Sequence, residues 1–343
     1  MGRLRTAIAG YGVVGRRRHD CLKCDTRFDI VAVGDKDILS IGSARHLDEN
    51  QILVFDDVNK LIQLELDVLF VCLPNYLAPE LTMLALNAGA HVFCEKPPGR
   101  DLDDIIKVRK VEKGQPTLKL RYGFNHRYHG SVVEASSIID SGDFGKVLNV
   151  MGCYGKSSFF GHKGLDWRID PKLSGGGILL DQGIHLVDLM RKFAGEFVEV
   201  KSFVQAQFWE YPVEDNAYAI MRTNENVVAM IHSSATMWQH TFSVKITLER
   251  GSILLSGILS GSGTYGEERI EIFTRRNGGG EEMFSTTIYK EDKSWGAEIA
   301  QFGDDIMLDR PVTNGNSSDA HCTMELISKI YDSDQGWRKF KEE

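Results

Sequence analysis

The chain opens with an apolar segment that runs into a glycine-rich turn, and this arrangement restricts the fold more than any other feature. Leu4–Ala9 leads directly into Gly10-Tyr11-Gly12-Val13-Val14-Gly15. In a strand–turn–helix unit, the first glycine permits the tight turn, the second lets the backbone approach a pyrophosphate, and the third lets the helix pack on the strand. The segment therefore predicts a parallel α/β unit that binds a dinucleotide at a helix N-terminus.

An acidic residue at the end of the next apolar segment supports this interpretation. Asp35 follows the last glycine by about twenty residues, where a carboxylate accepts hydrogen bonds from the adenosine ribose. The same carboxylate would repel a 2′-phosphate, which favours NAD over NADP. Lys36 comes next in the chain and partly offsets that repulsion, so NADP stays an alternative.

A second glycine motif of the same spacing serves as an internal comparison. Gly261-Ser262-Gly263-Thr264-Tyr265-Gly266 also follows an apolar segment, but the residues after it alternate as in a strand. We interpret this second motif as a loop without a bound nucleotide.

Length and charge limit the class of protein. A chain of 343 residues is typical of two domains, and a net charge of −8 argues against a nucleic-acid or anionic-membrane partner. No apolar run approaches the roughly eighteen residues that a membrane helix needs. The first strand begins almost at Met1, which leaves no room for a signal peptide and predicts a cytoplasmic protein.

The pattern of segments predicts a dinucleotide-binding domain over residues 1–122 and a substrate-binding and oligomerisation domain over residues 123–343. In the first, strands and helices alternate as in a doubly wound parallel sheet, with helices expected at 40–47, 57–64, 79–88 and 102–113. In the second, a helix at 131–141 precedes valine-, phenylalanine- and threonine-rich segments that predict a mostly antiparallel sheet. A last helix is expected at 319–333, with Ser317 or Ser318 as its N-cap and a possible return to the first domain.

The carboxyl ends of parallel strands carry function in such sheets. Two turns follow strand-like segments there and are expected to complete the cofactor site: Leu73, Pro74 and Asn75, and Glu95 and Lys96. The run Arg16-Arg17-Arg18 lies next to the glycine turn, and we interpret it as a solvated helix face without a specific role.

Three residues, Lys96, Asp181 and His185, suit the chemistry of a nicotinamide dehydrogenase. Oxidation of an alcohol needs a base near neutrality and a donor on the oxygen, which a histidine and a lysine supply. Asp181 and His185 are four positions apart, and Asp188 would share their face if the stretch is helical. A metal site at these residues is the competing interpretation, but no convincing third ligand is present and we predict none.

Taken together, these motifs resemble the glucose–fructose oxidoreductase / inositol dehydrogenase / MocA-type (Gfo/Idh/MocA) family over essentially the whole chain. The motifs that carry the resemblance are the glycine turn, Pro74-Asn75, Glu95-Lys96-Pro97, and Gly175-Gly176-Gly177 followed by Asp181-x-Gly183-x-His185-x-x-Asp188. The resemblance implies a Rossmann domain, an α+β domain with a large open-faced antiparallel sheet, and an active site between them. It also implies that Lys96, Asp181 and His185 are the catalytic set.

The resemblance implies that the substrate is a sugar, inositol or nucleotide sugar. It also implies that the chain forms a homodimer or homotetramer through the open sheet face. Side chains expected near the substrate are Asn125, Arg127, His162, Trp167 and Arg168. Two other functions stay open at this point. They are an NAD-dependent glycosidase and a non-catalytic nucleotide-binding regulator on the same fold.

Overall fold

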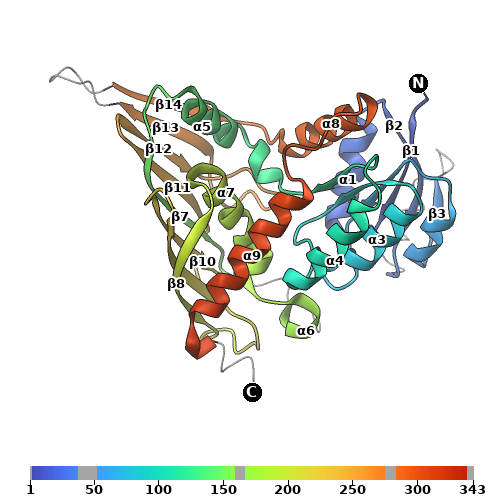
Figure 1. The fold of residues 1–343 in the computed structure, drawn as a ribbon, viewed down its shortest axis with the longest axis horizontal. Coiled ribbons are helices and arrows are strands. Elements are labelled where there is room, and N and C mark those ends of the chain that lie inside the picture. The colour runs from blue at the N-terminus through green and yellow to red at the C-terminus, as the bar shows by residue number, and fades with distance from the viewer. Residues whose placement is uncertain (1, 38–51, 159–166, 275–282, 338–343) are drawn as a thin grey trace. The chain divides into compact units, whose positions relative to one another are not determined.

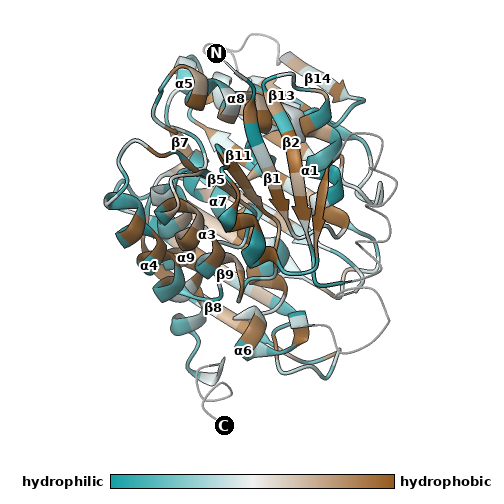
Figure 2. Cartoon of the chain, turned by 90° about the vertical axis from the view of Figure 1, so that its right-hand side faces the viewer, coloured by the Kyte–Doolittle hydropathy of each residue, from teal (hydrophilic) through white to brown (hydrophobic). Residues whose placement is uncertain are grey.

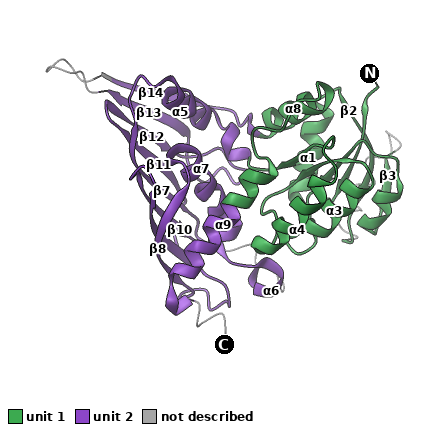
Figure 3. Ribbon diagram, viewed as in Figure 1, with its two compact units in different colours: residues 1–124, 295–322 green, residues 125–294, 323–343 purple. Residues whose placement is uncertain are grey.

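The computed structural model describes residues 2–37, 52–158, 167–274 and 283–337. These residues form two compact units, one of Met1–Phe124 with Trp295–Cys322 and the other of Asn125–Ser294 with Thr323–Glu343 (Figure 3). The first break lies close to the expected one. The segment Trp295–Cys322, which we expected in the second domain, belongs instead to the first unit.

The first unit is built on a six-stranded sheet of order β3-β2-β1-β4-β5-β6 in which every pair is parallel. This confirms the doubly wound α/β class. The strands are β1 (Leu4–Ala9), β2 (Phe28–Gly34), β3 (Leu53–Phe55), β4 (Val68–Val71), β5 (His91–Cys94) and β6 (Leu120–Tyr122). Hydrophobic residues run along β2 and the end of β1, as a sheet covered on both faces requires (Figure 2).

Helices connect these strands close to where the sequence predicts them. They are α1 (Val13–Lys23), the 3₁₀ helix η2 (Val58–Gln63), α3 (Ala78–Asn87) and α4 (Leu102–Lys113). Asp57 caps η2 and Asp101 caps α4, each by accepting the amide of a residue in the first turn. The helix expected at 40–47 lies outside the described residues.

Helix α8 (Ser294–Met307) was not predicted, and it explains why a late segment joins the first unit (Figure 1). Ile299 and Phe302 are fully buried in the core of the parallel sheet, where the Phe302 ring meets Phe70 and Phe93 edge-on. These apolar positions recur at helical spacing, which is the signal that could have revealed the helix.

The second unit is built on an eight-stranded sheet of order β14-β13-β12-β11-β7-β10-β9-β8. Only β7 and β10 are parallel neighbours in it, so the expected mostly antiparallel sheet is confirmed. The strands are β7 (Val147–Gly155), β8 (Phe197–Gln205), β9 (Asn216–Thr223), β10 (Val228–Ser234), β11 (Thr241–Leu248), β12 (Gly251–Ser256), β13 (Glu268–Thr274) and β14 (Met283–Tyr289).

The second unit also contains helices and short turns of helix. They are η3 (Asn125–Tyr128), α5 (Gly130–Ser141), η4 (Trp167–Ile169), α6 (Pro171–Ser174), the π-helical turn η5 (Leu179–Gly183) and α7 (Ile184–Ala194). Helix α7 lies on β7 and β10, while α5 lies on β12 and β13. The second glycine motif lies in the connection between β12 and β13, which has neither helix nor strand, as expected.

The last helix, α9, spans Ser317–Ser333 and begins two residues earlier than expected. Its N-cap is Asn316, whose Oδ1 accepts the amide of Asp319 at 2.9 Å. The prediction of Ser317 or Ser318 as the cap was therefore wrong, because both serines already lie inside the first turn. Within the described parts of the chain, none of the helices has the length and hydropathy needed to cross a bilayer.

Candidate active site

The glycine turn between β1 and α1 has the geometry that a dinucleotide needs. Gly10 has φ +87°, and a Cβ there would lie 2.3 Å from the Cys72 carbonyl oxygen. A Cβ on Gly15 would lie 1.9 Å from the Gly10 carbonyl oxygen, so both positions admit only glycine. A Cβ on Gly12 would meet no atom within 4 Å, which leaves open space beside the backbone where a pyrophosphate could approach.

The start of α1 is open to an anion. Gly12 is the N-cap and provides no side-chain cap, and the first turn contains no acidic residue. The first amides of the helix therefore have no carboxylate competing for them. Val13 is 78% exposed and Val14 also lies at the surface, as expected of apolar side chains that a bound cofactor covers. The residues present fit a dinucleotide.

Asp35, directly after β2, secures the same turn. Its Oδ2 accepts the Tyr11 amide at 2.6 Å and its Oδ1 accepts the Asp37 amide at 2.9 Å. A carboxylate has about four acceptor positions, so Asp35 can hold the turn and still accept ribose hydroxyls. Lys36 is exposed, and its ammonium donates to the Tyr76 hydroxyl at 3.5 Å.

The two further turns follow β4 and β5 in the same sheet, as expected. After β4, Leu73 and Pro74 lead to the buried Asn75. After β5, Glu95 is buried, its amide donates to the Val71 carbonyl at 2.8 Å, and Lys96 follows it. Lys96 thus stands directly after a side chain that is anchored in the unit.

Arg18 provides that anchor, and its interpretation as part of a solvated face was wrong. The side chain is fully buried, and its guanidinium donates to Glu95 at 2.6 Å and to Glu298 at 2.7 Å. It also lies 4.3 Å from the ring centres of both Phe93 and Trp295. The sequence alone did not reveal this because Glu298 and Trp295 lie on the unpredicted helix α8.

In the second unit, Asp181 and His185 lie on either side of a change in helix type. Asp181 belongs to the π-helical turn η5 and His185 to the first turn of α7. Asp181 lies 3.6 Å from the Lys156 ammonium and 4.0 Å from Arg168, so it faces two cations. The stretch is helical but changes from π to α type between these two residues, so the shared face of Asp181 and His185 stays a prediction.

Asp188 contributes to the structure of the unit. Its two carboxylate oxygens accept from Arg127 at 2.7 and 2.6 Å, and the pair is almost fully buried. Thr323 on α9 donates to the same carboxylate at 3.3 Å. Arg127 therefore has a structural partner here, and its contact with substrate stays a prediction.

The other expected substrate residues have mixed surroundings. Trp167 and Arg168 lie on η4, and the Arg168 guanidinium is 4.5 Å from the Trp167 ring centre and 4.0 Å from Asp181. Asn125 is buried and donates to the Ser294 hydroxyl at 3.1 Å. His162 lies outside the described residues.

The structure adds residues that the sequence analysis did not assign. His126 stacks on His185 with ring centres 3.7 Å apart and planes 14° apart, and its Nε2 lies 3.2 Å from the Tyr154 hydroxyl. Tyr265, from the second glycine motif, packs on the Tyr154 ring and donates to Gln182 at 3.3 Å. The only signal for these residues was the histidine-rich sequence 124–129 and a tyrosine within the loop.

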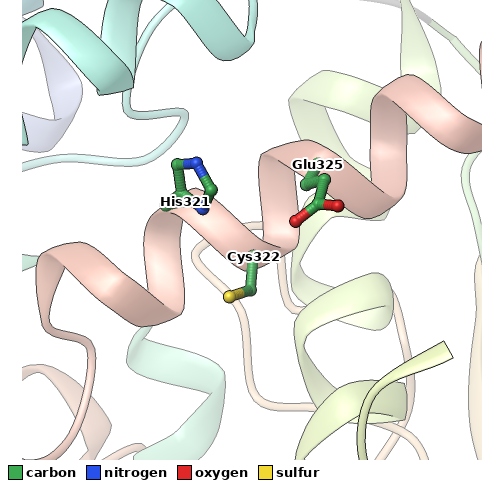
Figure 4. Close-up of side chains that lie close together, drawn as sticks. All are labelled: His321, Cys322 and Glu325. Atoms are coloured by element: carbon green, nitrogen blue, oxygen red, sulfur yellow. The ribbon is translucent and has the colours of Figure 1, made fainter. Parts of the chain in front are cut away.

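A group of possible metal ligands lies on α9, away from any predicted site residue in sequence. His321, Cys322 and Glu325 place one ligand atom each within 4.8 Å of the others (Figure 4). Each of the three side chains already has an interaction within the chain. All three come from little more than one turn of a single helix, so we assign no metal site to them.

Comparison with known proteins agrees with this geometry. Residues 4–123 match the profile described as "Oxidoreductase family, NAD-binding Rossmann fold", and residues 132–254 match the GFO/IDH/MocA C-terminal domain. D-glucoside 3-dehydrogenase of Escherichia coli (strain K12) is 26% identical, and the match covers 96% of this chain and 95% of that protein.

Two further matches involve levoglucosan dehydrogenase. The enzyme of Pseudarthrobacter phenanthrenivorans is 28% identical over 151 residues, which is 44% of this chain and only 38% of that protein. A solved structure titled as levoglucosan dehydrogenase in complex with NADH and levoglucosan shares the fold, with TM-score 0.87, 19% identity and 98% coverage of both chains. Both halves of the sequence thus match one family, and the chain belongs to the NAD-binding oxidoreductases of the Gfo/Idh/MocA family.

Proposed function

We propose that this oxidoreductase transfers a hydride between NAD and a secondary hydroxyl or ketone of a sugar, inositol or nucleotide sugar. The observation that carries the proposal is His185, a 5% exposed imidazole at the first turn of α7 that is held flat against a second imidazole. Relatives named for sugar oxidation, D-glucoside 3-dehydrogenase and levoglucosan dehydrogenase, support this substrate class.

The chain's own residues supply acid–base and electrostatic catalysis. NAD held at the glycine turn would supply the hydride acceptor for the carbinol carbon. His185 accepts the proton of the substrate hydroxyl, since an imidazole titrates near neutrality. The Lys96 ammonium donates a hydrogen bond to the same oxygen and stabilises the negative charge that develops on it. Asp181, between Lys156 and Arg168, orients polar groups of the substrate beside His185.

The test is NADH formation by purified protein across a panel of sugars, inositols and nucleotide sugars. With the best substrate, His185→Ala should lower kcat by about 10²–10⁴-fold and Lys96→Met by about 10²–10³-fold, with NAD affinity within a few-fold of wild type. Lys110→Met, on the exposed face of α4, is the matched control and should leave kcat unchanged.

Four outcomes of this test contradict the proposal. Absence of turnover across the whole panel excludes the substrate class, and full activity of His185→Ala excludes the assigned base. Release of an aglycone without net NADH identifies the NAD-dependent glycosidase instead. Binding of NAD without any turnover identifies the regulatory alternative.

We also propose that the chain forms a homo-oligomer through the face of the eight-stranded sheet opposite α7. Neighbouring strands present a continuous set of exposed apolar side chains on that face, at positions that pair directly across the sheet. They are Met151, Phe203, Tyr218, Ile220 and Met230. Apolar area gathered in this way is typical of a surface that another protein copy covers.

A further inference from the structure

The imidazole that stacks on His185 belongs to η3 and is buried to the same degree. His126 and His185 are 6% and 5% exposed, and their rings lie nearly parallel at 3.7 Å between centres. Phe242 on β11 contacts the His126 ring with ring centres 5.9 Å apart and planes 67° apart. The protonation state of His126 therefore bears directly on the proton that His185 takes up.

A chain of hydrogen bonds that ends at Asp292 determines the direction of each donor. The Asp292 carboxylate accepts the Ser294 amide at 3.0 Å and the Ser294 hydroxyl at 2.6 Å. Because a carboxylate only accepts hydrogen bonds, the Ser294 hydroxyl must donate its proton to Asp292. Its oxygen then accepts toward Asn125, so the Asn125 amide nitrogen must be the donor at 3.1 Å.

This orientation turns the carbonyl oxygen of Asn125 toward the histidine. Asn125 Oδ1 lies 3.3 Å from His126 Nδ1 and can only accept, so Nδ1 carries a proton. On the other side of the ring, His126 Nε2 lies 3.2 Å from the Tyr154 hydroxyl. Burial raises the pKa of Tyr154 well above its usual range, so the phenol keeps its proton and donates it to Nε2.

We propose that His126 is a positioning residue, held as the neutral Nδ1–H tautomer, that supports the His185 ring and leaves the proton of the stacked pair to His185. The proposal rests on the proposed role of His185 as the base. Two imidazolium rings stacked this closely would repel each other, so at most one of them is protonated at a time. A neutral ring under His185 also presents its π face to the imidazolium that forms.

The elements of this unit that carry or adjoin the stacked pair hold further titratable and charged groups, and Asp181 and Asp188 among them each face a cationic side chain. Those groups are Lys156 and Tyr154 on β7, Asp181 on η5, Arg168 on η4, Tyr265 in the β12–β13 loop, His129 with Glu268, and Arg127 with Asp188. The Asn125 and Tyr154 contacts reach the two ring nitrogens of His126. These two contacts therefore select its tautomer.

The test is ¹⁵N NMR of the full-length protein labelled at histidine, titrated between about pH 5.5 and 8.5, with signals assigned from His126→Phe and His185→Phe. We expect His126 to show the neutral Nδ1–H pattern throughout, and His185 to titrate within the range. An Nε2–H pattern for His126, or protonation of His126 before His185, overturns the proposal. This readout needs no substrate, so it is independent of whether the proposed function is correct.

Two pairs of variants test what sets the His126 tautomer and whether His126 positions His185. Ser294→Ala frees the Asn125 amide to turn over and should give His126 a mixture of tautomers, whereas Ser141→Ala, at the exposed end of α5, should not. In turnover, His126→Ala should lower kcat by about 100-fold through a displaced His185 ring, and His126→Phe should recover at least tenfold of that loss.

Each of these measurements can refute one part of the proposal for His126. An unchanged tautomer in Ser294→Ala refutes the hydrogen-bond argument, and equal turnover of the Ala and Phe variants refutes the positioning role. If His185→Ala is fully active while the tautomer is as expected, the proposed base is wrong and the structural part of the inference stands.

Discussion

Replacing Glu298 by glutamine tests the buried charge cluster that holds the turn before Lys96. One guanidinium, that of Arg18, faces the two buried carboxylates of Glu95 and Glu298. Burial raises the pKa of Glu298 from 4.5 to about 7, because the loss of hydration and the charge of Glu95 outweigh the attraction of Arg18. The structure thus contains a carboxyl group that titrates near neutrality.

The sign of the effect on stability follows from the two pKa values. In the unfolded chain this carboxyl has its ordinary pKa of 4.5, and in the folded protein about 7. Between these values the folded state binds more protons at this site, so the free energy of unfolding falls as pH rises. At 1.36 kcal/mol per pKa unit, the raised pKa of Glu298 is worth about 3 kcal/mol, present at low pH and lost as pH passes about 7.

Glutamine has the shape of the protonated carboxyl group and does not titrate. From about pH 5 to 8, we expect the variant to gain about 2.5 kcal/mol of unfolding free energy relative to wild type. Urea unfolding followed by tryptophan fluorescence measures this difference at each pH. Glu65→Gln, at an exposed position of the same unit, is the control and should run parallel to wild type. If the Glu298→Gln curve is also parallel to wild type, Glu298 does not titrate in this range and the argument from burial fails.

The glycine turn and the open sheet face give two further predictions. Gly12→Ala should keep the melting temperature and weaken NAD binding at least tenfold, because its methyl group fills the open space beside the turn. Gly15→Ala, unlike Gly12→Ala, should also lower the free energy of unfolding by about 1–3 kcal/mol, since its Cβ meets the Gly10 carbonyl oxygen. Thermal melts and NAD titrations distinguish these two variants, and equal melting temperatures of Gly12→Ala and Gly15→Ala would contradict the geometry of the turn. On the sheet face, Met230→Glu should reduce the molar mass measured by light scattering to that of a monomer. Val133→Glu, an exposed apolar position on α5, should not. An unchanged mass for Met230→Glu would show that the oligomer forms elsewhere or not at all.

Short-range pattern was enough to predict the nucleotide-binding part of the candidate site. Gly10, Gly12 and Gly15 lie within six residues, and each has a requirement set by its own backbone and immediate neighbours. Asp35 follows the next strand of the same α/β unit, so its place beside the turn also follows from local order. The alternation of polar and apolar residues likewise predicted most strands of both sheets, because side-chain direction repeats every two residues.

Helix caps and helix types were less predictable, because several local arrangements are close in energy. Asn316 rather than either serine caps α9, and the turn that carries Asp181 is π-helical rather than α-helical. A change of one residue in where a helix begins, or in which carbonyl an amide pairs with, alters the cap or the helix type. The packing of the rest of the unit selects among these local arrangements.

By itself, the sequence determined the parallel α/β unit, its glycine turn and acidic partner, and the order of the motifs that place the chain in its family. Only the tertiary structure decided that Arg18 is buried, since its partner Glu298 lies 280 positions away, on a helix that the sequence analysis did not assign. The tertiary structure also decided that His126 stacks on His185. It placed Asp292 where its carboxylate sets the direction of the hydrogen bonds that lead through Ser294 and Asn125 to His126. The physical reason is that burial, ion pairing and tautomer depend on which distant segments exclude water from a side chain, and neighbours along the chain do not carry that information.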